Sequence, residues 1–378
     1  MKINRLLLPQ LAQNVKPGHA TIVYGPRRAG KTTLVHTYLE SYTKPYLFLN
    51  ADELASREAL QTQDAKKLAE LVHGVDLLVI DEAQRVEEIG LNIKILVDTQ
   101  PQLAIIATGS ASFDLANKIN EPLTGRKTTF TLFPLSFAEL HVHEPGITPQ
   151  QHLERWLIWG GYPQSITSKS ITQREQFLSE LVGSYLYKDI LELEAIKRAD
   201  KIVDLLRLLA FQIGGEVSVA ELASNLSLNR ETVDRYLDLL EKVFVIFRVN
   251  GFSRNLRKEI AKNNRYYFYD NGVRNALIQN FNALKLRNDV GQLWENYIVS
   301  ERRKTNQYHG QTVNSYFWRT YDQKEIDIVE ESKGALHGYE IKWRKETVSK
   351  YTQNEFETAY PDSVVATVNT DNFKKFLQ

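Results

Sequence analysis

The sequence has no cysteine among its 378 residues. This absence excludes disulfide bonds, thiolate zinc sites and thiol nucleophiles, and it suits a reducing compartment, so we expect a cytoplasmic protein. The formal net charge is only +1, so a nucleic-acid site would have to be a local basic patch. No run approaches the roughly 18 apolar residues of a membrane helix, and the apolar N-terminal run is too short for a signal peptide, so we expect no membrane contact.

Residues 25–32 match the pattern G-x-x-x-x-G-K-[ST] at every fixed position. An apolar run at 21–24 precedes them and a helical pattern at 34–39 follows, which is the strand–turn–helix context of a P-loop. A chance glycine turn before Lys-Thr is the weaker interpretation. Lys31 is expected to bridge the β- and γ-phosphates of ATP, and the Thr32 hydroxyl to bind Mg²⁺. The predicted nucleotide-binding residues are Gly25, Pro26, Arg27, Arg28, Ala29, Gly30, Lys31, Thr32 and Thr33.

A second buried strand, at 76–80, ends in Asp81 and Glu82. We predict that Asp81 binds Mg²⁺ together with Thr32 and that Glu82 deprotonates the attacking water. An acidic pair can also be an ordinary strand-end turn, but the P-loop favours the catalytic interpretation. Near-continuous apolar runs that alternate with helices indicate a parallel sheet covered on both faces.

Two further candidates follow the next strand, at 103–107. Ser110 is the preferred sensor of the γ-phosphate, with Thr108 the second choice, and a plain strand-to-turn transition explains the pattern equally well. Arg126 is a candidate arginine finger supplied by a neighbouring subunit, which would require a homo-oligomer. A surface ion pair is the alternative for Arg126.

These motifs resemble one family, the AAA-type ATPases of bacteria and archaea that carry a C-terminal domain of unknown function. The resemblance covers most of the chain and includes residues 79–84, 108–110 and 125–126, followed by 133–137. It implies an extra strand between the P-loop strand and the Asp81 strand, a catalytic Glu82, and a helical lid that closes over the nucleotide. Arg155 and Arg174 are lid arginines that could contact ATP.

Two short amphipathic segments at 217–226 and 229–240 have a helix-turn-helix pattern. Ser218 and Asn229 stand at their N-cap positions, and apolar runs at 243–248 and 265–269 suit the strands of a wing. We predict phosphate contacts with duplex DNA, although acidic residues on the second helix leave a protein-binding winged helix as the alternative. The predicted DNA-binding residues are Asn229, Arg230, Thr232, Arg235, Arg254, Arg257 and Lys258.

The C-terminal part carries Asp327 on an alternating strand and Glu340-Ile341-Lys342 on the next. Side chains alternate along a strand, so Glu340 and Lys342 share a face, and hairpin pairing brings Asp327 near Glu340. This pattern resembles the PD-(D/E)XK restriction-endonuclease-like superfamily, with Glu295 on the preceding helix, although Ile326 stands where the motif has proline. The resemblance implies Mg²⁺ at Asp327, Glu340 and Glu295, with Lys342 activating water.

The sequence therefore predicts an α/β protein in four parts. They are a P-loop NTPase core with a parallel sheet at 1–136, a helical lid at 137–195, a winged helix at 196–280 and a nuclease-like domain at 281–378. The expected function is an ATP-hydrolysing, DNA-processing enzyme that uses ATP and Mg²⁺. The alternatives are a nucleotide-switched assembly ATPase with an inactive C-terminal domain, and a remodelling motor, for which no aromatic pore-loop motif is evident.

Overall fold

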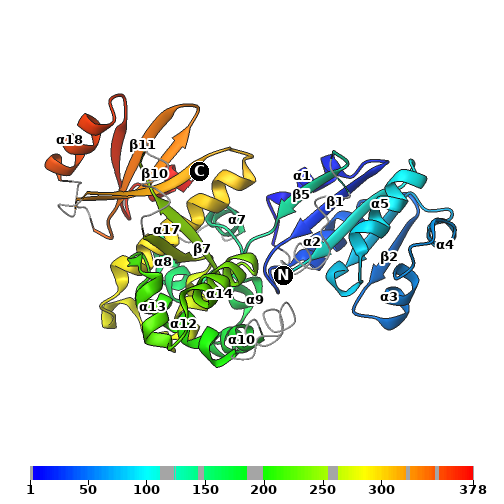
Figure 1. Cartoon of the computed structure of the whole chain (residues 1–378), viewed down its shortest axis with the longest axis horizontal. Helices are drawn as coiled ribbons and strands as arrows, with labels where there is room; N and C mark the ends of the chain where they lie inside the picture. The colour runs from blue at the N-terminus through cyan, green and yellow to red at the C-terminus, as the bar shows by residue number, and fades with distance from the viewer. Residues whose placement is uncertain are drawn as a thin grey trace. The chain divides into compact units, whose positions relative to one another are not determined.

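The structure is a computed structural model that describes residues 3–110, 123, 125–143, 149–184, 199–253, 263–320, 324–344 and 349–377. Its residues form two compact units. The first comprises Met1–Pro134 with Lys242–Phe244, and the second comprises Leu135–Leu186, Lys197–Glu241 and Val245–Gln378 (Figure 1). The predicted DNA-binding residues Arg254, Arg257 and Lys258 lie outside the described residues.

The first unit contains a parallel sheet with the strand order β2-β3-β4-β1-β5. The strands are β1 (His19–Tyr24), β2 (Tyr46–Asn50), β3 (Leu77–Asp81), β4 (Ala104–Gly109) and β5 (Lys127–Thr131). Strands β3 and β4 are buried along their whole length, because helices cover both faces of the sheet. The expected extra strand is confirmed, since β4 lies between the P-loop strand β1 and the Asp81 strand β3.

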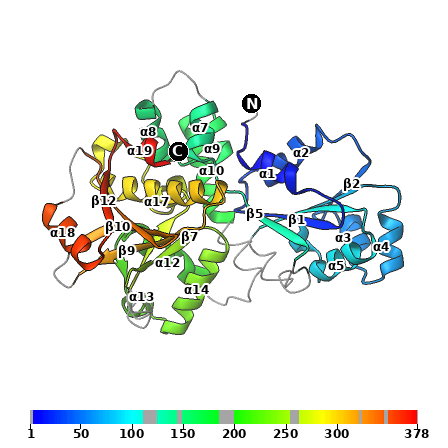
Figure 2. The same cartoon turned by 90° about the horizontal axis from the view of Figure 1, so that it is seen from above.

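Helices α1 and α2 lie on one face of this sheet and α3, α4 and α5 on the other (Figure 2). Their bounds are Leu7–Asn14, Lys31–Leu39, Leu54–Leu60, Ala65–Leu71 and Ile89–Thr99, and a short 3-10 turn, η1, spans Ala83–Arg85. Apolar residues of β1, β3, β4 and α5 form one core cluster. Because β1, β3 and β4 are parallel and share this core, their carboxyl ends lie together at one edge of the sheet.

The second unit begins with helices that pack around α16 (Asn271–Leu277). The helices before α16 are α7 (Phe137–His143), α8 (Pro149–Trp159), α9 (Pro163–Thr167), α10 (Ile171–Ser184), α12 (Ala199–Phe211), α13 (Val219–Leu226) and α14 (Arg230–Lys242). Both α8 and α10 contact α16, as does α12. The segment predicted as a lid thus packs with elements from the second half of the chain.

A mixed sheet of the second unit has the order β12-β11-β10-β9-β7-β8-β6. The strands are β6 (Glu216–Val217), β7 (Ile246–Gly251), β8 (Asn264–Phe268), β9 (Asn314–Arg319), β10 (Glu325–Ser332), β11 (Ala335–Ile341) and β12 (Val364–Val368). The antiparallel β6, β7 and β8 belong to the predicted winged helix, and β9 to β12 belong to the predicted nuclease-like domain. Strands β7 and β9 pair in parallel through Asn250 and Gly251 and join the two groups into one sheet.

The last helices complete this unit. They are α17 (Val290–Tyr308), α18 (Lys350–Ala359) and α19 (Phe373–Leu377), with a 3-10 turn, η3, at Leu284–Leu286. Helix α17 contacts β8, β11 and α8, while α18 contacts β12. Apart from Lys242–Phe244, the structure therefore groups the described residues from 137 onward into one unit where the sequence suggested three parts, because strand pairing and the contacts of α16 and α17 cross the predicted boundaries. Across the described residues, no helix has the length and apolar character that a membrane crossing requires.

Candidate functional site

The P-loop connects β1 to the first turn of α2. Gly25 has a φ of 149°, and a Cβ there would lie 2.1 Å from the Leu132 carbonyl oxygen, so only glycine fits. Gly30 is left-handed, with a φ of 98°, and precedes α2 directly. The buried Lys31 ammonium donates hydrogen bonds to the Gly25 and Pro26 carbonyl oxygens, at 3.0 and 3.1 Å. The loop backbone thus positions a positive charge and the N-terminus of α2 beside each other, as phosphate binding requires.

Asp81 is the centre of the first carboxylate cluster. It is only 4% exposed and accepts a hydrogen bond of 2.8 Å from the Thr32 hydroxyl. The Thr108 hydroxyl donates to the other carboxylate oxygen, and the same hydroxyl oxygen accepts the Glu82 N–H at 3.3 Å. The predicted pairing of Asp81 with Thr32 is therefore present in the structure. The carboxylate is oriented by two hydroxyl groups, each of which has lone pairs left for further ligands.

Glu82 follows the strand in a left-handed conformation, with a φ of 52°. Its carboxylate accepts a hydrogen bond of 2.5 Å from the Gln84 side-chain amide. The Gln84 amide oxygen is buried and has no partner among the described residues. Sequence reasoning missed a role for Gln84, although its place two residues after Glu82 in Asp-Glu-Ala-Gln was a usable signal.

The two remaining candidates of this unit have different surroundings. Ser110 is buried directly after β4, but the strand-end residue that contacts Asp81 is Thr108, the second choice from the sequence. The Arg126 guanidinium forms an ion pair with Asp98, and both side chains are well exposed. This contact is the surface ion pair named as the alternative, and the arginine-finger role of Arg126 stays a prediction.

The helix-turn-helix segment has the capping predicted for it. The Ser218 hydroxyl accepts the Glu221 N–H at 3.4 Å, and the Asn229 side chain accepts the Thr232 N–H at 2.7 Å. On α14, Arg230 and Arg235 are exposed and Thr232 is half-buried, while the opposite face of the helix is buried. The predicted contact residues in the described part thus share a surface, with the exposed Asp234 and Asp238 between and beside them.

Asp327 lies where β10 departs from regular pairing with β9. The register shifts between Ile326 and Val329, which marks a β-bulge, and both apolar residues belong to one core cluster. Bulges reorient side chains, and here Asp327 is buried and accepts the Ile341 N–H at 2.8 Å. The Asp327 carboxylate thus accepts a backbone N–H that would bond to a carbonyl oxygen in a regular ladder. This anchors Asp327 against β11.

Glu340 and Lys342 lie beside Asp327, as the hairpin predicts. Strand pairing of Ile328 with Tyr339 makes Asp327 and Glu340 the next residues on the two strands. Lys342 Nζ lies 2.7 Å from Glu340 Oε1, whereas Glu340 Oε2 is buried with no partner among the described residues. Burial and the neighbouring Asp327 charge raise the pKa of Glu340 to about 7, despite the contact with Lys342.

Glu295, from α17, completes the predicted set and faces an arginine that the sequence analysis did not assign. Burial and the Asp327 charge raise the pKa of Glu295 to about 8. Its carboxylate accepts a hydrogen bond of 2.7 Å from the Tyr267 hydroxyl and lies 3.7 Å from Arg265 Nη1. The same guanidinium lies 3.5 Å from Asp327 and 2.6 Å from Glu325. We call Glu295, Glu325, Asp327, Glu340, Arg265 and Lys342 the C-terminal cluster.

A pocket of about 420 Å³ opens onto this cluster, and Glu295, Asp327 and Lys342 line it. Asp327 and Glu340 fit a divalent cation, because they lie side by side and Glu340 Oε2 has no partner within the described residues. Glu295 Oε1 already accepts the Tyr267 hydroxyl and faces Arg265, and the role of Glu295 as a third metal ligand stays a prediction. Within the described part of the chain, no group of three or more histidine, aspartate or glutamate side chains is placed to hold a metal ion.

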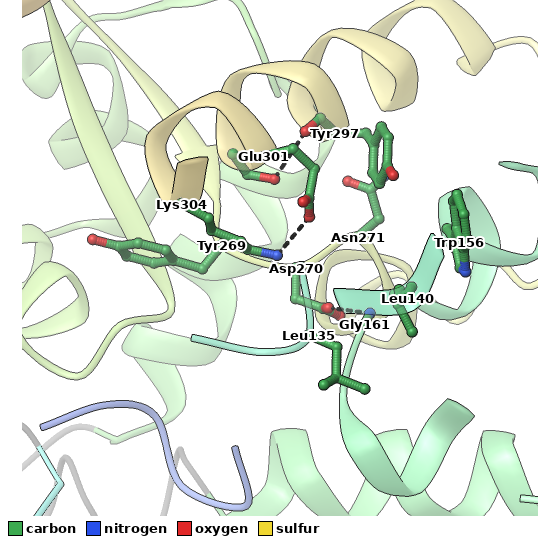
Figure 3. A pocket seen from close by; sticks show the side chains of 12 residues that line it. Leu135, Leu140, Trp156, Gly161, Tyr269, Asp270, Asn271, Tyr297, Glu301 and Lys304 are labelled. Carbon is green, nitrogen blue, oxygen red and sulfur yellow. Dashed lines mark hydrogen bonds and ion pairs between the residues drawn. The ribbon is translucent and has the colours of Figure 1, made fainter. Parts of the chain in front are cut away.

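A second buried polar group surrounds Asp270 (Figure 3). Its carboxylate accepts the Gly161 N–H at 2.7 Å and the Val273 N–H at 3.1 Å, and Glu301 pairs with Lys304 nearby. A Cβ on Gly160 would lie 2.0 Å from Asp270, so glycine is required there. The cavity measures only about 10 Å³, room for about one water molecule. We therefore interpret this buried polar group as part of the fold and not as a ligand site.

The arginines proposed for the lid also bind backbone. Arg155 donates to the Ile166 carbonyl oxygen. Arg174 donates to the Ser165 and Ser168 carbonyl oxygens, at 3.1 and 2.9 Å. These bonds satisfy carbonyl oxygens in and just after the last turn of α9, and contact of Arg155 or Arg174 with ATP stays a prediction.

Comparisons with known proteins agree with the first unit's geometry. Residues 18–141 match the model of the AAA domain. Residues 150–284 and 290–375 match two domains of unknown function, DUF8612 and DUF4143. The P-loop, the Asp81–Glu82 pair and the strand order, together with this match, identify residues 18–141 as an AAA-type P-loop ATPase domain.

The chain is similar to several uncharacterized proteins over most of its length. It is 29% identical to one from Mycobacterium tuberculosis over 328 residues, which are 85% of this chain and 69% of that protein. A protein from Haemophilus influenzae is 25% identical over 98% of this chain and 91% of its own length. Among solved structures, the Walker-type ATPase PABY2304 of Pyrococcus abyssi aligns at 18% identity and a TM-score of 0.47, over 72% of this chain and 93% of that one.

Proposed function

We propose that the chain is an ATP-hydrolysing, DNA-binding enzyme whose C-terminal cluster cuts DNA with one divalent metal ion. The observation that carries this proposal is the side-by-side placement of Asp327 and Glu340, with Lys342 adjacent and no partner for Glu340 Oε2 among the residues that the structure describes. The first unit supplies nucleotide hydrolysis. Glu82 activates the attacking water, Lys31 binds the phosphates, and Mg²⁺ bound near Thr32 and Asp81 would neutralise their charge.

The helix-turn-helix segment supplies DNA contact in this proposal. Arg230 and Arg235 on α14 bind phosphates, and Asn229 fixes the start of that helix. Since these are backbone contacts, binding should be sequence-tolerant and should weaken as salt rises. We further propose a winged helix, because the helices α12, α13 and α14 and the strands β6, β7 and β8 follow its order.

The C-terminal strands β9 to β12 lie in sequence order in the sheet, with α17 before them and α18 between the last two. This arrangement supports a restriction-endonuclease-like domain. In it, Asp327 and Glu340 would hold Mg²⁺, which lowers the pKa of bound water and stabilises the charge that develops on the phosphate. Lys342, ion-paired to Glu340, would orient that water and contact the phosphate.

One observation favours a second candidate, a nucleotide-switched assembly ATPase with no nuclease activity. The Arg265 guanidinium already neutralises part of the C-terminal cluster, as it would in a purely structural site. In that case Glu82 sets the lifetime of an ATP-bound state, and a protein partner stimulates turnover.

One set of samples separates the two candidates. ATPase rates are measured with and without duplex DNA, and the same samples are assayed for Mg²⁺-dependent nicking. DNA-stimulated turnover with nicking that Asp327→Asn removes supports the proposal. Turnover that DNA leaves unchanged, with no nicking, contradicts it and supports the assembly ATPase.

A variant pair tests the DNA surface. Arg230→Ala with Arg235→Ala should weaken DNA binding and lower the slope of log affinity against log salt by about one per phosphate contact. Arg207→Ala, on the exposed face of α12, is the matched control and should leave the slope unchanged. Equal slopes in all three proteins would remove α14 from the DNA interface.

A further inference from the structure

We propose that Arg265 is a tethered cation that takes the place of a second divalent ion, so that the C-terminal cluster binds a single ion at Asp327 and Glu340. This inference rests on the proposed metal site and specifies its stoichiometry.

The Arg265 guanidinium lies among the carboxylates of the cluster. Arg265 belongs to β8, yet its Nη1 lies 3.7 Å from Glu295 and 3.5 Å from Asp327, between carboxylates of α17 and β10. Its Nη2 makes a close ion pair of 2.6 Å with Glu325. One charged group thus bridges three carboxylates from two other elements, which is the task that a metal ion performs in a carboxylate site.

The Arg265 guanidinium is held in place by burial and by an aromatic ring. The Arg265 side chain is only 4% exposed, and its charged carbon lies 4.6 Å from the centre of the Phe317 ring. A stacked, buried arginine keeps its plane and cannot move into water without losing both contacts. The Arg265 charge is therefore a constant part of the cluster and not a mobile surface group.

Carboxylates outnumber cations in the cluster. It holds four carboxylates, of Glu295, Glu325, Asp327 and Glu340, against two cations, Arg265 and Lys342. Without Arg265, the four carboxylates would face Lys342 as the one remaining cation of the cluster, an arrangement that favours binding of a further positive ion.

The carboxylate oxygens of the cluster differ in whether they already have hydrogen-bond partners. Asp327 Oδ2 accepts the Ile341 N–H, and Glu295 Oε1 accepts the Tyr267 hydroxyl, so both groups are partly used. Glu340 Oε2 is the buried carboxylate oxygen of the cluster that has no partner within the described residues. The open coordination therefore lies on the Glu340 side of Asp327, while the Glu295 side belongs to Arg265.

Metal counting tests this inference without an activity assay. Mn²⁺ is titrated into the full-length protein without nucleotide or DNA, and free Mn²⁺ is followed by electron paramagnetic resonance. The wild type should bind one ion that Asp327→Asn eliminates. Arg265→Met should bind one additional ion, and the added substitution Glu295→Gln should remove it again.

Arg302→Met is the matched control. Arg302 also pairs with a carboxylate, Glu330, at 2.7 Å and lies 4.5 Å from the centre of an aromatic ring, that of Phe376. Within the described part of the chain, Arg302 contacts none of the proposed metal ligands, so this variant should bind Mn²⁺ as the wild type does. If Arg265→Met does not fold, Arg265→Gln keeps a hydrogen-bond donor without the charge and should bind the same additional ion.

The outcomes are distinct. An Asp327-dependent ion in the wild type, with the same number and affinity in Arg265→Met and Arg265→Gln, overturns the inference and leaves the proposed metal site intact. No Asp327-dependent ion in the wild type overturns both the inference and the proposed metal-dependent function. An additional Glu295-dependent ion in the Arg265 variants alone supports the inference.

Discussion

The two carboxylate clusters of this chain handle negative charge by different means. In the first unit, Asp81 is oriented by the Thr32 and Thr108 hydroxyls, which are uncharged. In the second, Asp327 and Glu295 face the buried guanidinium of Arg265, and Glu340 faces Lys342. Hydroxyl groups orient a carboxylate and leave its charge for a metal ion, whereas a guanidinium uses part of that charge. Metal ligands therefore cannot be assigned from the carboxylates alone, because the positions of the neighbouring cations also decide which oxygens can bind a metal ion.

The largest difference should appear on removing the buried lysine of the P-loop. Lys31→Ala eliminates the ammonium that would stabilise the transferring phosphoryl group, and ATP hydrolysis should fall at least about 100-fold. DNA cleavage measured without ATP should not change. Steady-state phosphate release checks this, with the exposed Lys67→Ala as the control for charge removal. A Lys31→Ala rate within twofold of wild type would show that the P-loop is not the hydrolytic site.

Removing the buried Arg265 cation of the second cluster should lower the stability of the protein. Arg265→Met leaves Glu295 and Asp327 buried without their charge partner, and the free energy of unfolding should drop by about 3–5 kcal/mol. Adding Glu295→Gln should recover part of this loss, which denaturant unfolding of the two variants measures. No coupling between the two substitutions would mean that the ion pair across 3.7 Å contributes nothing to stability.

Much of the first unit was predictable from the sequence, and the reason is local. The P-loop and the Asp81–Glu82 pair each sit within one strand–turn segment, so their chemistry and geometry come from neighbouring residues. The β4 insertion required the family resemblance, because strand order is a long-range property. Gln84 was missed since its bond to Glu82 depends on the left-handed backbone at Glu82.

In the second unit, the sequence predicted some residues of the C-terminal cluster and missed others. The placement of Asp327, Glu340 and Lys342 followed from strand alternation and hairpin pairing, both local rules. Arg265 lies 62 residues before Asp327 and reaches it only through the β7–β9 pairing that joins two groups of strands. The bulge that orients Asp327 was not predicted from the sequence either, although the adjacent apolar residues Ile328 and Val329 interrupt the alternation there.

Asp289 is a carboxylate with two arginine partners, and its pKa is lowered, whereas the pKa of Glu295 is raised. Burial acts to raise the pKa of Asp289, but hydrogen bonds from Arg287 and Arg274 lower it to about 2. A lowered pKa stabilises the fold above the ordinary value of 3.8, and this contribution is lost as pH falls through about 2. Asp289→Asn should therefore cost about 2 kcal/mol at pH 7 and roughly half of that at pH 3. Urea unfolding at several pH values tests this, and a cost independent of pH would contradict it.

The smallest expected effect concerns the Thr108 hydroxyl, which bonds to the Asp81 carboxylate and to the Glu82 backbone N–H. Thr108 is fully buried, donates to Asp81 and accepts from the Glu82 backbone. Thr108→Val keeps the shape but removes the hydroxyl, and kcat for ATP should fall about tenfold, the effect of one hydrogen bond to a charged group. Thr108→Ser should restore most of the rate. If the serine variant is as slow as the valine variant, shape rather than hydrogen bonding explains the loss.

The most direct test of the whole account compares ATP turnover in Glu82→Gln and Asp327→Asn under identical conditions. Each substitution replaces one carboxylate by an amide, in the first and second clusters respectively. The account predicts that Glu82→Gln still binds ATP but loses turnover by about 100-fold or more, since its general base is gone, while Asp327→Asn hydrolyses ATP at the wild-type rate. Wild-type turnover in Glu82→Gln would contradict the assignment of the catalytic base and, with it, the central claim.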